Sequence, residues 1–154
     1  MRLSTKFSDT IHLLAFLQVY SDIKLTSAVI AASIQTSPVV VRRLVGALKN
    51  AGFIDNDPKN HNPRIAIDPK DITLLDIYLI TEGHTPLFVI DKETNPLCRV
   101  GGNIQPVLTN IYGEAEQAAL TVLNSKTMQD IIDSLIVHNK VKQAKEKSDL
   151  AQDA

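Results

Sequence analysis

Apolar residues recur with a helical period in the first part of the chain. Residues 5–21 carry apolar side chains every three to four positions, including Ile11, Leu14 and Leu17, and this spacing is typical of an amphipathic helix. A hydroxyl at Thr26 or Ser27 can accept the free N–H groups of a first turn, which predicts a short helix up to residue 33.

A third helix is predicted over residues 37–50. Ser37 followed by Pro38 is the pattern of an N-cap and a first helical position, and Gly52 supplies the stop. At 100° per residue one side of this helix is apolar and comprises Val40, Val41, Leu44, Ala47 and Leu48. The other side comprises Pro38, Val39, Arg42, Arg43, Gly46 and Lys49. Three adjacent valines would also suit a strand, but the capping signal and the Leu44/Leu48 spacing favour a helix.

The helices are followed by a pattern typical of a hairpin. Phe53–Ile54 and residues 65–67 are short apolar runs, and a polar loop over 55–64 joins them. Pro58 and Pro63 keep that loop out of regular structure. Three helices followed by a hairpin predict a winged helix-turn-helix, with the loop as its wing.

The second half is predicted to be largely helical. Residues 68–83 resume a helical period that Gly83 ends, and residues 84–102 read as an irregular connection with one strand at 87–90. Residues 103–124, which Asn103 could cap, carry an apolar seam at steps of three and four: Ile104, Leu108, Ile111, Ala115, Ala118 and Val122. This spacing packs one helix along another and predicts a dimer interface. Thr127 and Asp130 resemble a capping box for one more helix.

The expected fold class is therefore mainly α with a small β wing, a winged helix-turn-helix domain plus a long dimerisation helix. We divide the chain into a DNA-binding domain (1–83), an effector or linker segment (84–102), dimerisation helices (103–138) and a polar tail without regular structure (139–154).

Charge is distributed unevenly between the two halves. Residues 1–70 hold nine Lys/Arg and five Asp/Glu, whereas residues 71–154 hold seven and twelve. A basic first half suggests contact with a polyanion, although chance segregation of surface charge fits this number equally well.

Arg42 and Arg43 are the main candidates for DNA contact. They lie in the second turn of the predicted recognition helix, and the planar guanidinium suits both phosphate and guanine. Val39 could touch a thymine methyl, and the N–H groups at Ser37 could hold a phosphate. Further candidate contacts are Arg2, Lys6, Lys49, Lys59 and Arg64, with His61 beside them in the wing. The alternative interpretation is a set of solvated surface charges.

Cys98 is the only cysteine. One thiolate cannot build a disulfide within the chain, and it does not supply the several ligands of a zinc site or an iron–sulfur cluster. Arg99 and a helix start near Asn103 would favour the thiolate, so Cys98 is a candidate redox sensor; the alternative is an inert small hydrophobe.

Catalysis and membrane insertion find no support in the sequence. The four histidines show no metal-ligand spacing, and there is no Gly-rich phosphate loop or nucleophile elbow, so we expect neither an enzyme nor a metal protein. No run approaches the roughly 18 apolar residues of a membrane span, and Met1–Lys6 does not open a signal peptide, which makes the cytoplasm the expected location.

Four segments, taken together, resemble a known family. "MRLSTKFSDTIHLLAFL", "SPVVVRRLVGALKNAGFI", "ITLLDIYLITEG" and "CRVGGNIQPVL" are similar, in order and spacing, to the Rrf-two (BadM-type) family of bacterial winged helix-turn-helix transcriptional regulators. The resemblance covers about residues 1–138. It implies a homodimer that represses or activates transcription from a short inverted repeat in double-stranded DNA.

Two departures from that family change what the resemblance implies. Many members bind an iron–sulfur cluster through three cysteines in the link, whereas Cys98 stands alone here, as in the cluster-free branch. The wing has "KNHNPRIAI" in place of the family's paired glycines. The DNA contacts that the family's wing makes can therefore be carried over to this chain only weakly. A low-molecular-weight thiol that binds to oxidised Cys98, or a small ligand in residues 84–102, could act as effector. The rival function is a protein-interaction module that binds an acidic protein.

Overall fold

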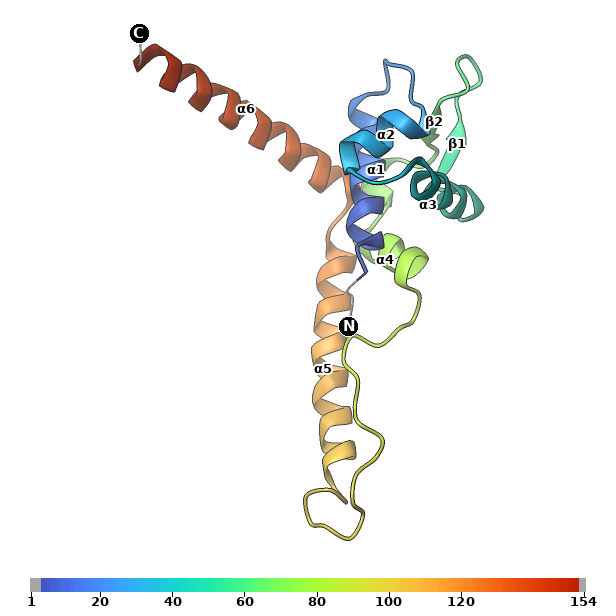
Figure 1. Ribbon diagram of the computed structural model, residues 1–154, viewed down its shortest axis with the longest axis vertical. Coiled ribbons are helices and arrows are strands. Elements are labelled where there is room, and N and C mark those ends of the chain that lie inside the picture. The colour runs from blue at the N-terminus through green and yellow to red at the C-terminus, as the bar shows by residue number, and fades with distance from the viewer. Residues whose placement is uncertain (1–3, 153–154) are drawn as a thin grey trace.

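The computed structural model describes residues 4–152, and most of this chain is helical. The element order is α1 (Lys6–Val19), α2 (Ser27–Ile34), α3 (Pro38–Asn50), β1 (Ile54–Asn56), β2 (Pro63–Ile65), η1 (Pro69–Asp71), α4 (Leu74–Glu82), α5 (Ile104–Ser125) and α6 (Met128–Gln152). A body formed by α1–α4 and the hairpin carries two arms: α5 with the 84–102 segment beside it, and α6 projecting from the same junction (Figure 1).

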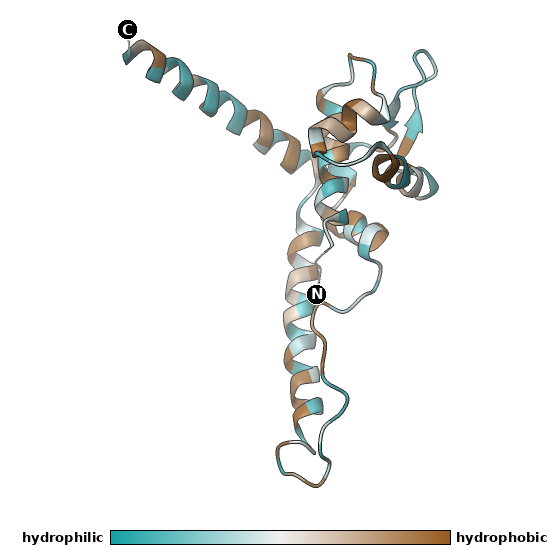
Figure 2. Cartoon of the chain, in the orientation of Figure 1, coloured by the Kyte–Doolittle hydropathy of each residue, from teal (hydrophilic) through white to brown (hydrophobic). Residues whose placement is uncertain are grey.

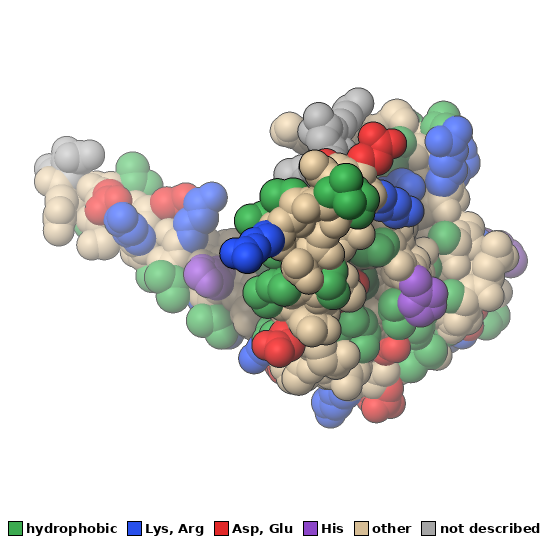
Figure 3. Space-filling view, turned by 90° about the horizontal axis from the view of Figure 1, so that it is seen from below, with side chains coloured by type: hydrophobic (Ala, Val, Ile, Leu, Met, Phe, Trp, Pro, Cys, Tyr) green, Lys and Arg blue, Asp and Glu red, His purple; other side chains and the backbone are tan. Residues whose placement is uncertain are grey.

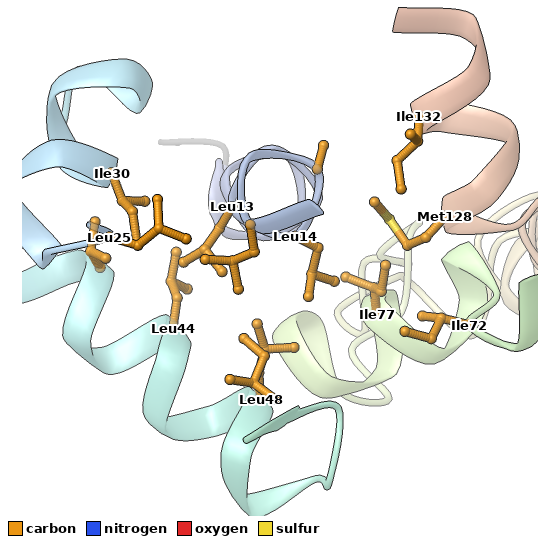
Figure 4. Close-up of a cluster of buried hydrophobic side chains, with 14 of the residues drawn as sticks. Leu13, Leu14, Leu25, Ile30, Leu44, Leu48, Ile72, Ile77, Met128 and Ile132 are labelled. Atoms are coloured by element: carbon orange, nitrogen blue, oxygen red, sulfur yellow. The ribbon is translucent and has the colours of Figure 1, made fainter. Parts of the chain in front are cut away.

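The core lies inside the body and is aliphatic. Leu13 and Leu14 of α1 are fully buried and meet Leu48 of α3 and Ile77 of α4, while Met128 of α6 closes the other side (Figure 4). Each such side chain contributes about 1.5–3 kcal/mol through the apolar surface that it removes from water. The first turns of α6 are therefore part of the core, although the rest of that helix is not.

The predicted ends of the first helices are confirmed. Thr26 and Ser37 each accept a backbone N–H, from Val29 and Val40 respectively, and Pro38 occupies the first turn of α3. Gly52 follows the end of α3 with φ +81°, a left-handed conformation that glycine adopts without a Cβ penalty. Ala47 differs from the prediction: it is exposed, because the buried stripe of α3 is the narrower set of Val41, Leu44 and Leu48.

The hairpin is an antiparallel pair in which Ile54 faces Ile65 and Asn56 faces Pro63. Its strands extend closer to the tip than predicted and leave a loop over 57–62. The predicted strand at 87–90 is wrong, because this segment runs along α5 with no neighbouring strand to pair with among the described residues. The predicted helix over 68–83 starts only at Leu74, after the 3₁₀ turn that Pro69 begins, because Thr73 and Asp76 form a capping box there.

A second capping box holds the α5–α6 junction. Asp130 accepts hydrogen bonds from the N–H and hydroxyl of Thr127 (2.8 and 3.0 Å), as the sequence predicted, and these bonds lower the pKa of the Asp130 carboxyl. Backbone bonds from Leu74 N to Lys126 O and from Met128 N to Ile72 O join this junction to the start of α4. Both arms are thereby tied to the body at one point.

The polar tail was predicted to lack regular structure, and that prediction is wrong for residues 139–152. They continue α6 as an exposed helix whose outer part is mostly hydrophilic (Figure 2). Lysine, alanine, glutamine and glutamate are good helix formers, and Lys142 and Glu146 have the i, i+4 spacing of opposite charges that stabilises a helix. Within residues 4–152 no single helix is long and apolar enough to cross a membrane; α2 and α3 reach that composition only as a pair bent by 105°.

Candidate nucleic-acid interface

The outer face of α3 presents the side chains that the sequence singled out. Val39 is 48% exposed, and Arg42, Arg43 and Lys49 are exposed as well. Neither arginine forms an ion pair with any residue of the described chain, in which only Arg64 does so. The buried stripe of α3 turns this face outward, so three positive charges are available to an external anion.

The two arginines point to different sides of α3. Arg42 and Lys49 line a hollow of about 440 Å³ between α3, α2 and the hairpin. Arg43 lines another of about 270 Å³ on the side of α1 and α4, together with Lys6. The structure thus places Lys6, a predicted contact from the first helix, in the lining of the same hollow as Arg43. Arg2 lies outside the described residues.

Arg64 in the wing is engaged within the protein. Its Nε donates to Asp55 Oδ1 at 2.7 Å and its Nη2 to Asp55 Oδ2 at 3.3 Å, with Asp57 Oδ2 at 3.6 Å from Nη1. The hydrogen bond from Arg64 lowers the pKa of the Asp55 carboxyl, and the same bond raises the pKa of the guanidinium. Arg64 therefore braces the two strands, and DNA contact by this residue stays a prediction.

The tip of the wing is shaped by Asp57. Its carboxylate accepts the N–H groups of Lys59 and Asn60, and its carbonyl accepts the N–H of His61 at 2.9 Å. His61 has φ +59°, a left-handed conformation that persists in non-glycine residues only where the surroundings impose it. This conformation places His61 in the lining of the hollow that Arg42 and Lys49 share, while Lys59 stays exposed.

Asn62 is a residue that the sequence analysis missed. Its side chain is buried, with its Nδ2 donating to Ile23 O at 2.7 Å and its Oδ1 accepting from Leu25 N at 3.1 Å. These bonds attach the wing to the turn between α1 and α2. No sequence signal marks Asn62 among the polar residues of the loop, because its partners lie about 40 positions away.

The 84–102 segment carries Cys98 in an exposed turn. Thr94 donates to Gly101 O at 2.7 Å, and Gly102 N donates to Cys98 O at 2.8 Å. The N–H groups of Gly101 and Val100 lower the pKa of the Cys98 thiol because they stabilise its thiolate. Arg99 and the helix start were the expected causes, but the two backbone donors lower this pKa instead. Asn103 does not cap α5; its side chain donates to Arg99 O instead.

Four of the six residues of the predicted seam of α5 are exposed in the single chain. Ile111 and Val122 are 55% and 57% exposed, Ala115 and Ala118 are exposed, and Ile104 and Leu108 are half-buried. A different face of α5, with Gln105 and Tyr112, meets the 84–92 segment through Phe88, whose ring lies 5.3 Å from that of Tyr112. The part of the seam from Ile111 to Val122 therefore does not serve to pack α5 against its own chain.

Hydrophobic side chains are also exposed along the 84–102 segment beside α5. Leu97 is 94% exposed, Val89 82% and Val100 67%. Seen from below, several separate patches of hydrophobic side chains lie on the surface, with charged side chains among them (Figure 3). Within the described residues no group of three or more His, Cys, Asp or Glu side chains converges as metal ligands would.

Three comparisons place this architecture among known proteins. The Rrf2 family model, described as an iron-dependent transcriptional regulator, matches residues 3–134. YwnA of Bacillus subtilis strain 168, named as an HTH-type transcriptional regulator, is 32% identical over 133 residues, which are 86% of this chain and 98% of YwnA.

Solved structures with similar folds agree with these two matches. A structure described as a transcriptional regulator from Lactobacillus plantarum has a TM-score of 0.73 at 23% identity and covers 95% of this chain and 99% of its own. CymR, named as the global cysteine regulator of B. subtilis, has a TM-score of 0.64 at 20% identity, covering 86% and 97%. At these identities the two structures support the fold, which is that of winged-helix DNA-binding regulators.

Proposed function

This chain belongs to the Rrf2 family of transcriptional regulators, and from that premise we propose that it binds an inverted-repeat operator as a homodimer through α3. The observation that carries the proposal is the outer face of α3, where Arg42, Arg43 and Lys49 are exposed without acidic partners. Arginines in the second turn of a recognition helix can reach base edges and phosphates of the major groove.

The homodimer rests on the uncovered seam of α5. Ile111, Ala118 and Val122 would be covered by the same seam of a second copy, and the alanines would allow the two helices to approach closely. Such pairing places two recognition helices on one face of the DNA, about 34 Å or one helical turn apart.

An iron centre does not fit the ligands that this chain offers. Cys98 is the sole cysteine, and no set of three potential ligands converges within the described chain. A cluster needs several thiolates, so we propose that the protein regulates transcription without one. Its signal would enter through the 84–102 segment, either by thiol chemistry at the exposed Cys98 or by a small ligand beside α5.

The decisive experiment is selection of bound duplexes from a random pool at moderate salt. The wild type is compared with the Arg42→Ala/Arg43→Ala double variant and with Lys140→Ala/Lys142→Ala, which removes the same charge from α6. We expect an inverted repeat to be enriched by the wild type and by the α6 variant only. Each arginine is expected to contribute about 1–3 kcal/mol of specific binding.

Retention of full affinity by the arginine variant would contradict the role of α3. Failure of the wild type to enrich any duplex would favour the protein-interaction module, in which Val39 and the arginines bind an acidic protein. Enrichment of a single half-site, without an inverted repeat, would contradict the homodimer but not DNA binding through α3.

A further inference from the structure

A hollow of about 680 Å³ lies between α5 and the segment that runs beside it (Figure 1). Residues 88–92 line one wall, and α5 lines the other from Gln105 to Glu116. A volume of this size is in the range of small-molecule sites. At 100° per residue the lining positions of α5 lie about a third of a turn around the helix from the seam, so the proposed dimer leaves the hollow accessible.

Two sets of contacts hold the walls of this hollow together without a ligand. Gln105 Nε2 donates to the carbonyl oxygens of Asp91 and Lys92, at 3.1 and 2.9 Å. The ring of Phe88 lies against that of Tyr112, with 5.3 Å between the ring centres. The hollow is therefore formed before a ligand arrives, which lowers the entropy that binding costs.

The walls combine aromatic rings with aliphatic surface. Phe88 remains 45% exposed although it contacts Tyr112, and Val89 next to it is 82% exposed. The face of an aromatic ring is negative, so it attracts cations, and the edge of a second ring packs well against it. These walls suit a ligand that is largely apolar and carries rings.

The charges in the lining determine which apolar ligand fits. The hollow has two carboxylates, Asp91 and Glu116, and one ammonium group, Lys92, and none of the three forms an ion pair within residues 4–152. Glu116 is half-buried whereas Lys92 is exposed, so water and salt screen the negative charge of Glu116 less. Asp91 Oδ1 accepts the N–H of Glu93 at 2.9 Å, which leaves the second oxygen for a ligand. The hollow therefore favours a positively charged ligand.

Gly113 provides space in the wall that α5 forms. Glycine in the middle of a helix costs about 1 kcal/mol relative to alanine. No atom lies within 4 Å of the position that a Cβ would take at Gly113, and this residue lines the hollow. A larger side chain there would fill the hollow without displacing the chain.

Glu116 also connects the hollow to the body of the molecule. Burial raises the pKa of Tyr78, and the negative charges of Glu82 and Glu116 raise that pKa further. Tyr78 belongs to α4, and its ring meets that of Phe7 in α1 with 5.4 Å between the ring centres. A cation bound beside Glu116 would therefore change the electrostatic field at a residue that packs against the first helix of the body.

We propose that this hollow binds a small organic cation that carries aromatic rings, with Phe88 and Tyr112 against its rings and with Asp91 and Glu116 facing its charge. The same ligand is the effector of the protein. This second part rests on the proposed function, because an effector needs operator binding to act on, whereas the ligand site itself does not depend on DNA.

The probe for the ligand site is tetraphenylphosphonium, and its control is tetraphenylborate, an ion of similar size and shape and of opposite charge. Binding to the full-length protein is measured by isothermal titration calorimetry in the absence of DNA. We expect tetraphenylphosphonium to occupy one site per chain and to bind at least about tenfold more tightly than tetraphenylborate. Equal affinity for the two ions would overturn the proposal.

Two variants test the groups that recognise the ligand. Glu116→Gln removes a charge and Phe88→Leu removes a ring face, and each should weaken phosphonium binding about fivefold. Glu114→Gln removes the same charge from an exposed position of α5 outside the hollow and should bind like the wild type. Equal affinities of Glu116→Gln and Glu114→Gln would contradict the role of the hollow's carboxylates.

A filled hollow tests the location of the site without loss of the fold. Gly113→Leu should abolish phosphonium binding and should not lower the melting temperature, because leucine is a better helix former than glycine. Gly46→Leu makes the same change at an unhindered glycine of α3 and should leave phosphonium binding intact. Unchanged binding by Gly113→Leu would overturn the site.

The effector role is tested with operators from the selection. Saturating tetraphenylphosphonium should change the operator affinity of the wild type about fivefold or more, and should not change that of Gly113→Leu. An unchanged affinity of the wild type would overturn the effector role. Absence of any operator binding would overturn the proposed function and the effector role with it, whereas the calorimetry decides the ligand site separately.

Discussion

The only cysteine illustrates how a few backbone atoms set the reactivity of a side chain. Cys98 is exposed, and two N–H groups of its turn stabilise its thiolate. The segment that contains this turn lies at the far end of α5 from the helix-turn-helix (Figure 1). A lowered pKa increases the thiolate fraction at a given pH, and the thiolate is the reactive form. A single cysteine does not by itself make this turn a sensor, but the reactivity of its thiol can be measured.

We predict that Cys98 is alkylated by iodoacetamide with a midpoint at lower pH in the folded protein than in the urea-denatured protein. Because there is no second thiol, the pH–rate profile reports on this side chain alone. Arg99→Ala should leave the midpoint unchanged, since the donors are the N–H groups of Val100 and Gly101. Identical midpoints in the folded and denatured protein would contradict this account.

The hairpin, as an element, has too few strand bonds to hold its own position. Its strands are three residues each, and a two-stranded hairpin is marginally stable in water. Asn62 compensates by linking the wing to the α1–α2 turn, and all of its buried polar atoms have partners. The wing therefore acts as part of the body.

Replacement of Asn62 by leucine should destabilise the protein by about 1–3 kcal/mol, because the buried Leu25 N–H and the Ile23 C=O both lose their hydrogen-bond partner. Chemical denaturation measures this directly. Asn60→Ala, in the same loop but exposed, should cost less. A smaller loss for Asn62→Leu than for Asn60→Ala would show that the wing is held elsewhere.

At the scale of the whole molecule, the single chain leaves its two arms uncovered. The seam of α5 and the hydrophobic end near Leu97 face outward, although the body has a closed core. Exposed apolar surface on this scale marks an interaction site. A second copy of α5 is the partner that we propose for the seam, since its spacing is that of paired helices.

Ile111→Glu should convert the dimer to a monomer. The substitution occurs twice in a two-fold interface, and each isoleucine contributes about 1.5–3 kcal/mol when buried, so the dissociation constant should rise at least about hundredfold. Gln117→Glu adds the same charge on the polar side of α5 and should leave the dimer intact. Sedimentation velocity distinguishes the two, and a dimeric Ile111→Glu variant would exclude this seam.

The sequence by itself determined the local structure of most elements. Thr26, Ser37 and Gly52 act as caps through neighbours within a few positions, and the stripe of Val41, Leu44 and Leu48 follows from the helical period. The same period already turned Arg42, Arg43 and Lys49 outward. These features depend on interactions between near neighbours, which a sequence records directly.

Only the tertiary structure decided what depends on distant residues. The separation of Arg42 from Arg43 arises because α2 and the wing lie on one side of α3, and α1 and α4 on the other. Asn62 finds partners in another turn, and Arg64 is engaged by Asp55 across the hairpin. Cys98 owes the lowered pKa of its thiol to the path of its own backbone rather than to the charge next to it. Composition cannot specify such geometry, because it forms only when the chain folds.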